Sequence, residues 1–319
     1  MVHVDVPLLG VIFVFSLVIS TLTSLFLIKS FASAGKQNGN RDSHRRVETI
    51  PISRLGGCGI FLGSMFGVVV MGLGDNKIFA QWIPVLVTVT LMFGLGLWDD
   101  LKPLGAKRKL AGQFLIAAVA YSIGLRVETL SGFGPAESIH LSSSVAFLLT
   151  LAWLIVIPNI INLIDGVDGL AGGLGVLIGT TMVVLTAASG NSIALGICLA
   201  FVAAQIGFLF FNFPPAKIYM GDGGAYFIGS FIAAVSLSSS QKGSIAAMFL
   251  VIIIALGLPI LDTAFAITRR GIRGLPLFRA DAKHIHHKLL DLGYSKRRVV
   301  SFLYILSAAC SFAGLMVFW

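Results

Sequence analysis

Five aspartates lie at the ends of long apolar stretches, where a membrane-embedded chain rarely carries charge. They are Asp99 and Asp100 in GLGLWDDLKPLG, Asp165 and Asp168 in NLIDGVDGLAGG, and Asp222 in FNFPPAKIYMGDGG. Carboxylates from three separate segments suit a site that binds Mg²⁺ with a phosphorylated substrate, because Mg²⁺ takes oxygen ligands from one or two carboxylates, phosphates and water. The pattern predicts such a site beside lipid.

Each acid also has a purely structural interpretation. The acidic pair that ends at Asp100 could simply terminate a helix, although acids there are mildly unfavourable with the helix dipole. Asp222 could cap the helix that follows it. A turn or a cap explains one of Asp165 and Asp168, but not both of them together with Asn162. We therefore favour the functional interpretation for all three segments.

The last polar stretch, TRRGIRGLPLFRADAKHIHHKLL, holds three histidines, His284, His286 and His287. A zinc site is one interpretation, but no fourth ligand stands at zinc spacing and the HExxH pattern is absent. A structural loop is another. Because arginines and a lysine surround the histidines, we expect them to donate hydrogen bonds to phosphate oxygens.

The composition is that of a membrane protein. The 319 residues are 56% hydrophobic and 12% charged, with a mean hydropathy of +0.94, whereas soluble domains are roughly 45–50% apolar and 25% charged. The net charge of +9 does not indicate a nucleic-acid partner, because the basic residues fall in short loops between apolar spans. We expect an all-α, polytopic protein of one domain, 1–319, embedded in the bilayer.

At about 20 apolar residues per span, the sequence predicts ten transmembrane helices. They are 6–28, 57–74, 82–98, 110–125, 144–163, 170–188, 193–212, 224–239, 244–267 and 299–318. Asp262 lies inside the ninth range, either as a functional acid or as a buried partner of Arg269 or Arg270. We expect a short amphipathic segment or an extended hairpin in the loop 126–142.

The alternation of these spans places five loops on one face. They are 29–56, 99–109, 164–169, 213–223 and 268–298, and they carry 20 of the 23 Lys and Arg residues. By the positive-inside rule this face is cytoplasmic. All five aspartates fall on it, so the predicted site faces the cytoplasm.

Taken together, these motifs resemble those of the bacterial polyprenyl-phosphate N-acetylhexosamine-1-phosphate transferases. The resemblance runs from PISRLGG, at residues 51–57, through the DD pair, NLIDGVDGLA and FNFPPAKIYMGDGG to KHIHHKLLDLGYS. It implies an enzyme of the bacterial inner membrane that starts a lipid-linked cell-envelope glycan. The lipid phosphate of undecaprenyl phosphate attacks the β-phosphorus of a UDP-N-acetylhexosamine and releases UMP. A homodimer is a further expectation.

The resemblance also implies roles for single residues. Asp222 binds Mg²⁺, for which Mn²⁺ is the alternative, with Asn162 or Asp165 near the metal. Asp99 and Asp100 position or deprotonate the lipid phosphate, and Asp165 belongs to the same catalytic group. The remaining expected contacts to substrate come from Arg54 in the first loop, from Asp168 and Asn212 at the uridine, and from His284, His286 and His287 at the diphosphate.

Elementary chemistry limits the role of a base. A phosphate nucleophile and a diphosphate leaving group repel each other, so cationic groups must neutralise the charge before attack. A phosphate monoester has a second pKa of about 6, so the lipid phosphate is already mostly dianionic at neutral pH and needs no base. Asp99 could orient this phosphate or form a covalent intermediate. The sequence leaves both mechanisms open.

Other classes fit the sequence less well. A cation-coupled transporter carries its acids near the middle of the bilayer, whereas these lie at one face. A zinc intramembrane protease would need its helix motif, and a CDP-alcohol phosphotransferase would need an arginine that LIDGVDGLAGG lacks. Among donor sugars we expect GlcNAc, with FucNAc and QuiNAc as alternatives.

Overall fold

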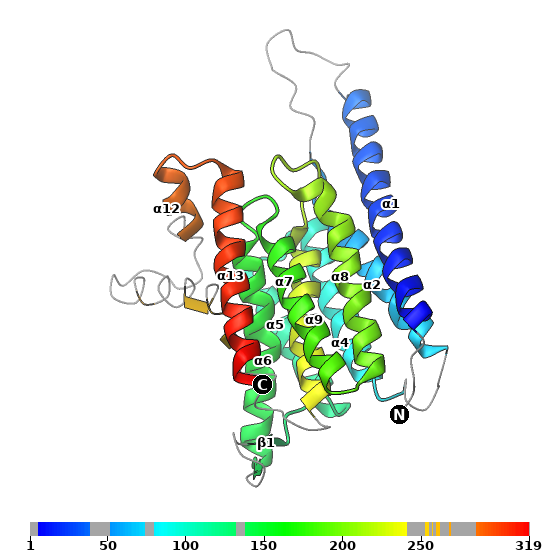
Figure 1. Ribbon diagram of the computed structural model, residues 1–319. Helices are drawn as coiled ribbons and strands as arrows, with labels where there is room; N and C mark the ends of the chain where they lie inside the picture. The colour runs from blue at the N-terminus through cyan, green and yellow to red at the C-terminus, as the bar shows by residue number, and fades with distance from the viewer. Residues whose placement is uncertain are drawn as a thin grey trace.

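The computed structural model describes residues 6–38, 52–73, 80–131, 138–240 and 285–318, together with residues 253, 254, 257, 260, 261 and 268. This part contains ten helices. They are α1 (Val6–Asn38), α2 (Gly57–Gly72), α4 (Ile83–Leu101), α5 (Ala106–Ser122), α6 (Ser143–Ile164), α7 (Leu170–Ala188), α8 (Ser192–Asn212), α9 (Gly221–Ser240), α12 (Ile285–Asp291) and α13 (Lys296–Phe318). The longer ones form an upright bundle, and the short helix α12 lies at its side next to α13 (Figure 1).

A helix lies at nine of the ten ranges that hydropathy predicts. The tenth range, 244–267, falls mostly outside the described residues, and so does Asp262. Of the described helices, α1, α4, α6, α7, α8 and α13 are long and apolar enough to cross a membrane, and α2 is a shorter apolar helix. The protein is therefore helical and polytopic, while the prediction of ten spans is not confirmed.

Several helices extend by a few residues into the predicted loops, and two helical segments lie well inside them. Helix α1 continues to Asn38, well into the range predicted as loop 29–56, and the seven-residue helix α12 lies inside the range 268–298. Both segments are polar, and hydropathy marks where an apolar stretch stops rather than where helical hydrogen bonding stops. Neither segment carries one of the five aspartates, so these differences do not change where the aspartates lie.

Helix α9 lies in the middle of the bundle and packs against α4 and α6 (Figure 1). Its aromatic side chains stack on those of its neighbours: the ring centroids of Phe231 and Phe201 on α8 are 3.9 Å apart. Phe227 meets Phe61 of α2 edge to face at 5.4 Å. Such pairs hold helices at fixed heights, so the first turn of α9, which carries Asp222, has a defined position in the bundle.

Helices α1 and α2 meet through small residues. Gly59 and Gly63 on α2 lie against Ser20 on α1, where an added Cβ would come within about 3 Å of the α1 backbone or side chains. Ser20 donates its hydroxyl to the Ala204 carbonyl of α8 at 2.6 Å. Small residues let membrane helices approach closely, so this contact fixes the segment that leads into α2 and toward the site.

The loop between α5 and α6 forms a two-stranded antiparallel hairpin, which confirms the predicted extended hairpin. Strand β1 (Thr129–Ser131) pairs with β2 (Ser138–His140), with Thr129 opposite His140. It follows the C-terminal end of α5 and precedes α6, at the opposite end of the bundle from the five aspartates (Figure 1). These two short strands are the exception to an all-α fold in the described part of the chain.

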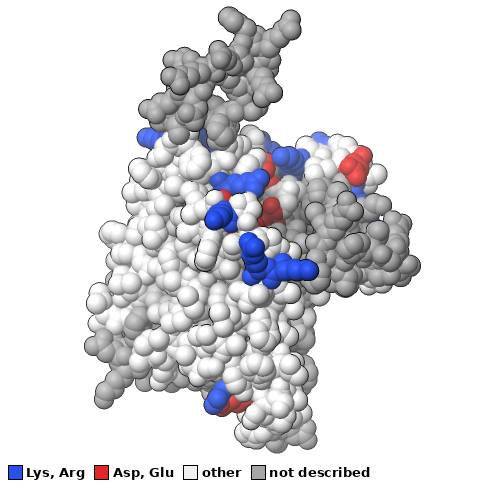
Figure 2. Space-filling model, turned by 180° about the vertical axis from the view of Figure 1, so that it is seen from behind, with Lys and Arg blue, Asp and Glu red and all other residues white. Residues whose placement is uncertain are grey.

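Basic side chains are distributed unevenly between the two ends. On the face shown in Figure 2, the described Lys and Arg residues gather toward the end that carries α12 and the start of α13, and only a small group lies at the opposite end. At that opposite end Arg126 pairs with Glu128 at 2.6 Å. The asymmetry that the sequence predicts is therefore also present in three dimensions.

Candidate active site

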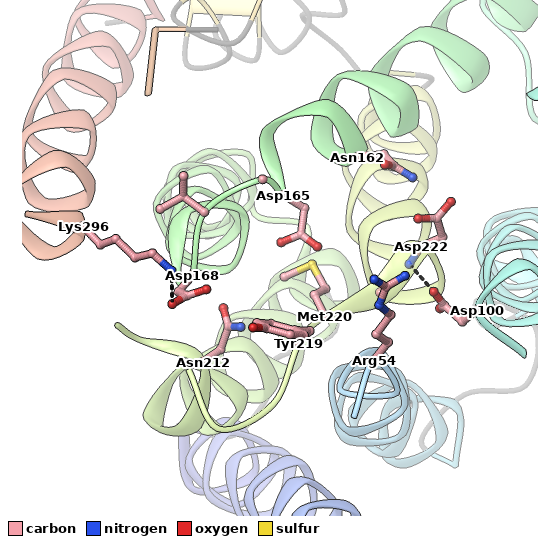
Figure 3. A pocket seen from close by; sticks show the side chains of 13 residues that line it. Arg54, Asp100, Asn162, Asp165, Asp168, Asn212, Tyr219, Met220, Asp222 and Lys296 are labelled. Carbon is pink, nitrogen blue, oxygen red and sulfur yellow. Dashed lines mark hydrogen bonds and ion pairs between the residues drawn. The ribbon is translucent and has the colours of Figure 1, made fainter. Parts of the chain in front are cut away.

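A cavity of about 370 Å³ opens at the end of the bundle where the aspartates gather (Figure 3). Its walls come from the segment before α2, the ends of α4, α6 and α8, the α6–α7 and α8–α9 connections, and the starts of α9 and α13. The lining residues are Arg54, Asp100, Asn162, Asp165, Gly166, Val167, Asp168, Asn212, Tyr219, Met220, Gly221, Asp222 and Lys296. Residues that are far apart in sequence therefore share one polar chamber.

Backbone pairing brings Arg54 to this cavity. The segment before α2 runs alongside the segment before α9, and the Tyr219 amide donates to the Ser53 carbonyl at 2.8 Å. In return the Gly56 amide donates to the Tyr219 carbonyl at 3.0 Å. These bonds satisfy backbone groups that would otherwise be unpaired at the membrane rim. They fix the first-loop motif against the loop that carries Asp222.

Asp100 caps helix α9. Its Oδ1 accepts the backbone amide of Asp222, and its Oδ2 accepts that of Gly223, both at 2.8 Å. The first amides of a helix have no partners within the helix, and a carboxylate also complements the positive end of the helix dipole. Asp100 therefore positions Asp222 across a contact between two helices.

Gly221 permits this close approach. Its φ is +73°, a backbone conformation that L side chains rarely adopt. A Cβ at this position would lie 2.6 Å from Oδ2 of Asp100. Any larger residue would push the capping carboxylate away from α9. Steric fit therefore explains why Gly221, the first glycine of MGDGG, is a glycine.

Lys109, at the start of α5, bridges two of the predicted acids. Its Nζ donates to Asp222 Oδ2 at 2.6 Å and to Asp99 Oδ2 at 3.1 Å. The other oxygen of Asp99 accepts the Leu104 amide at 2.8 Å. Asp99 therefore lies beside the cavity and is not among its lining residues. The ammonium group holds two carboxylates together that would otherwise repel each other.

Asp165 points into the cavity between the two ends of the chamber (Figure 3). Its carboxylate makes no hydrogen bond or ion pair with a described residue. Burial raises the pKa of Asp165 well above its ordinary value, and the negative charges of Asp222, Asp100 and Asp168 raise it further. The chamber has an excess of negative charge around this residue, which a bound cation would relieve.

Asp168 and Asn212 form the other end of the cavity. The Asn212 Oδ1 accepts the Gly169 amide at 2.9 Å, and its Nδ2 donates to the Ile218 carbonyl at 2.8 Å. Asn212 thereby ties the α6–α7 connection to the α8–α9 connection. Lys296, the first residue of α13, donates from its Nζ to Asp168 Oδ2 at 3.1 Å.

The structure brings together most of the residues predicted from the sequence. Seven of them line the cavity: Arg54, Asp100, Asn162, Asp165, Asp168, Asn212 and Asp222. His284 lies outside the described residues, and the side chains of His286 and His287 are likewise not described. The roles assigned to all of these residues stay predictions.

Some residues of the site were not predicted from the sequence. Among them are Lys109, Tyr219, Met220 and Lys296. Lys109 and Lys296 lie in the basic runs AKRK and SKRR, where nothing local distinguishes one lysine from the next. Tyr219 and Met220 lie in the motif IYMGDGG, close to the predicted Asp222, and this proximity is a signal that could have identified them.

The donor groups fit Mg²⁺ better than a softer metal. Asp222, Asp165 and Asn162 supply only oxygen atoms, the ligand type that Mg²⁺ prefers. Among the described residues no group of three His, Cys, Asp or Glu side chains lies close enough to hold a metal by itself. Such a set suits an ion that takes the rest of its ligands from phosphates and water.

Comparison with known proteins agrees with this geometry. Residues 82–240 match the model of glycosyl transferase family 4. A probable undecaprenyl-phosphate N-acetylglucosaminyl 1-phosphate transferase of Bacillus subtilis is 35% identical over 310 residues, which cover 95% of this chain and 84% of that protein. Decaprenyl-phosphate N-acetylglucosaminephosphotransferase of Mycobacterium tuberculosis is 34% identical over 82% of this chain and 71% of its own.

A third relative is named for a different substrate. The phospho-N-acetylmuramoyl-pentapeptide-transferase of Bacillus thuringiensis is 31% identical over 308 residues, covering 91% of this chain and 90% of that protein. Similarity to these three transferases therefore covers between 82% and 95% of this chain. The chain belongs to glycosyl transferase family 4.

Proposed function

We propose that this protein transfers N-acetylhexosamine-1-phosphate from a UDP-sugar to undecaprenyl phosphate and releases UMP. The observation that carries the proposal is the meeting of Asp100, Asp165 and Asp222, from three separate segments of the chain, in one polar cavity at the end of a membrane bundle. Relatives with 34–35% identity bear the names of polyprenyl-phosphate GlcNAc-1-phosphate transferases. The product would be a lipid diphosphate sugar that starts a cell-envelope glycan.

The location of the cavity supports a substrate that is half lipid. It opens where α4, α6 and α8 end, so a phosphate on a polyprenyl chain can reach it while the chain stays among the apolar helices. We place the protein in the bacterial inner membrane with this end toward the cytoplasm. The excess of Lys and Arg in the loops at this end supports that orientation.

Different residues of the site have different roles in the proposed reaction. Arg54 reaches into the cavity from the first loop and offers a planar cationic group for phosphate oxygens (Figure 3). Asp100 keeps the first turn of α9 in place, so Asp222 keeps its position facing the cavity. Lys109 places a positive charge at the same edge. Such preorganised charges act on the transferring phosphoryl group without reorganising during the reaction.

Mg²⁺ held by Asp222 with Asn162 and Asp165 would neutralise the charge that develops on the UMP leaving group. The raised pKa of Asp165 agrees with a site that lacks one positive charge. His284, His286 and His287 are proposed to close over the diphosphate, as their motif implies. Asp99 either orients the lipid phosphate, which needs no base at neutral pH, or itself attacks the β-phosphorus. In the second case UMP leaves as the aspartyl bond forms, and the lipid phosphate then displaces Asp99 from the phosphorus.

GlcNAc is the donor sugar we propose, because the relatives that carry this sugar in their names align over most of the chain. UDP-FucNAc and UDP-QuiNAc are the alternatives with the same chemistry. A cation-coupled transporter is not supported, because the acids gather at one end of the bundle rather than at its middle.

The direct test is turnover by purified protein in detergent or nanodiscs. Undecaprenyl phosphate, Mg²⁺ and a panel of UDP-sugars are supplied, and UMP release is measured. We expect UMP only when the lipid phosphate and the metal are both present, and the fastest release with UDP-GlcNAc. Release of UDP instead of UMP, or release without lipid, would contradict the proposal.

A further inference from the structure

The start of α13 is built into the cavity by three separate contacts. Lys296 Nζ donates to Asp168, Arg297 Nε donates to the Pro214 carbonyl at 2.8 Å, and the Tyr304 hydroxyl donates to the Gly169 carbonyl. These contacts reach both connections that form the far end of the chamber. The last described helix is therefore a wall of the site rather than a peripheral membrane anchor.

The Asp168 carboxylate is held by one of its two oxygens. Oδ2 accepts Lys296 Nζ at 3.1 Å and the Ala216 amide at 3.4 Å. Oδ1 has no hydrogen-bond partner among the described residues. In Figure 3 this second oxygen is turned away from Lys296 and toward the rest of the chamber. Asp168 lines the cavity, and a carboxylate oxygen without a protein partner is suited to accept an N–H or O–H group of a ligand there.

Resting on the proposed function, we propose that Lys296 is a positioning residue for the donor. It holds Asp168 by one oxygen, so that the other accepts a hydrogen bond from the nucleoside part of the UDP-sugar. The imide N–H of uracil and the ribose hydroxyls are the groups of the donor with the required chemistry. Lys296 then sets donor affinity through Asp168 rather than through the phosphates.

Stability alone gives little reason for this ion pair. The side chain of Lys296 is 55% exposed and that of Asp168 13%. Pairs with one exposed partner contribute little to folding, because solvent screens them and the lysine loses rotamer freedom. An effect of Lys296 substitution on donor binding without an effect on stability would therefore separate positioning from a structural role.

The experiment uses the full-length protein and four variants, Lys296→Met, Lys296→Arg, Asp168→Asn and the Lys296→Met/Asp168→Asn double variant. Arg298→Met is the matched control, because Arg298 lies on the same turn of α13 and does not line the cavity. KM for UDP-GlcNAc, kcat and the dissociation constants of UDP and uridine are measured, with the melting temperature as the folding check. Lys296→Gln replaces Lys296→Met if the melting temperature falls.

We expect Lys296→Met to raise KM for the donor about two- to tenfold, the equivalent of one lost hydrogen bond, with little change in kcat. UDP and uridine should weaken by the same factor, and Lys296→Arg should restore binding. The double variant should bind no worse than Asp168→Asn alone, because both changes remove the same contact.

Three outcomes would overturn the inference. They are unchanged donor affinity in Lys296→Met, a loss confined to UDP, which would mean direct phosphate contact, and additive losses in the double variant. Failure of the proposed function is recognisable separately, because the unsubstituted protein would then neither bind UDP nor release UMP.

Discussion

Lys109 and Asp222 form a close ion pair, with 2.6 Å between Nζ and Oδ2, and the same ammonium group contacts Asp99 at 3.1 Å. Three segments of the chain are joined by this one charge. Asp222 is also the residue proposed to bind Mg²⁺. A lysine and a divalent cation therefore act on the same carboxylate, which gives the first prediction.

Replacing Lys109 should change the response of the protein to metal. In Lys109→Gln, Asp99 and Asp222 repel each other without compensation, so the metal-free melting temperature should fall. Mg²⁺ should then raise it by more than in the unsubstituted protein, because no ammonium competes for Asp222. Thermal melts with and without Mg²⁺ measure both effects. Lys107→Gln, an exposed neighbour, is the control, and an equal Mg²⁺ shift in both variants would refute the competition.

Asp222→Asn tests the metal assignment itself. The amide keeps the shape of the side chain but loses the charge that attracts a cation, so Mg²⁺-dependent UMP release should be abolished. UMP release over a range of Mg²⁺ concentrations is the measurement. Asp291→Asn, at an exposed acid on α12, should behave like the unsubstituted protein. Full activity of Asp222→Asn would remove this residue from the metal site.

Substitution of Asp99 and substitution of Asp100 should have different effects on stability and kinetics. Asp100→Asn leaves one acceptor oxygen where two amides need one each, so α9 loses part of its cap and about 0.5–2 kcal/mol of stability. Its apparent affinity for Mg²⁺ should also fall, because Asp222 moves with the helix. Asp99→Asn should instead lower kcat more than it weakens UDP-sugar binding.

Denaturation and steady-state kinetics of the two variants decide between these outcomes. If Asp100→Asn melts like the unsubstituted protein, the cap is not supported by the solution behaviour. If Asp99→Asn weakens donor binding more than turnover, Asp99 belongs to the nucleotide end of the site.

Asp165 predicts a pH dependence of stability. Its pKa is higher in the folded protein than in the unfolded chain, so the fold favours the neutral carboxyl group. The stability it contributes is present below the unfolded pKa of about 4 and is lost as the pH rises through the folded value. Without metal, Asp165→Asn should therefore melt higher than the unsubstituted protein at pH 8 and nearly equally at about pH 4. An increment that does not depend on pH would contradict the charge argument.

Mg²⁺ should reduce this difference at pH 8, because a cation favours the ionised carboxylate. The same variant should lose activity despite its greater stability. Melting curves in chelator and in Mg²⁺, compared at the two pH values, give the measurement.

Much of the fold follows from the sequence for a simple reason. A membrane span must satisfy its backbone internally and must be apolar over about 20 residues, so hydropathy alone places helices within a few residues. The C-terminal end of α1 and the position of α12 were not predicted, because polar segments can be helical without any hydropathy signal. The hairpin at β1 and β2 was expected only as one of two forms.

The residues of the site were also only partly predictable from the sequence. The sequence by itself determined which acids are unusual, since charge at the rim of an apolar stretch stands out locally. Four of the five acids, Asp100, Asp165, Asp168 and Asp222, line the cavity. Only the tertiary structure decided their partners. Lys109 and Asp222 are 113 residues apart, and Lys296 and Asp168 are 128 apart. Ion pairs depend on distances in space that helix packing creates, and no spacing along the chain encodes which lysine of a basic run will reach a particular carboxylate.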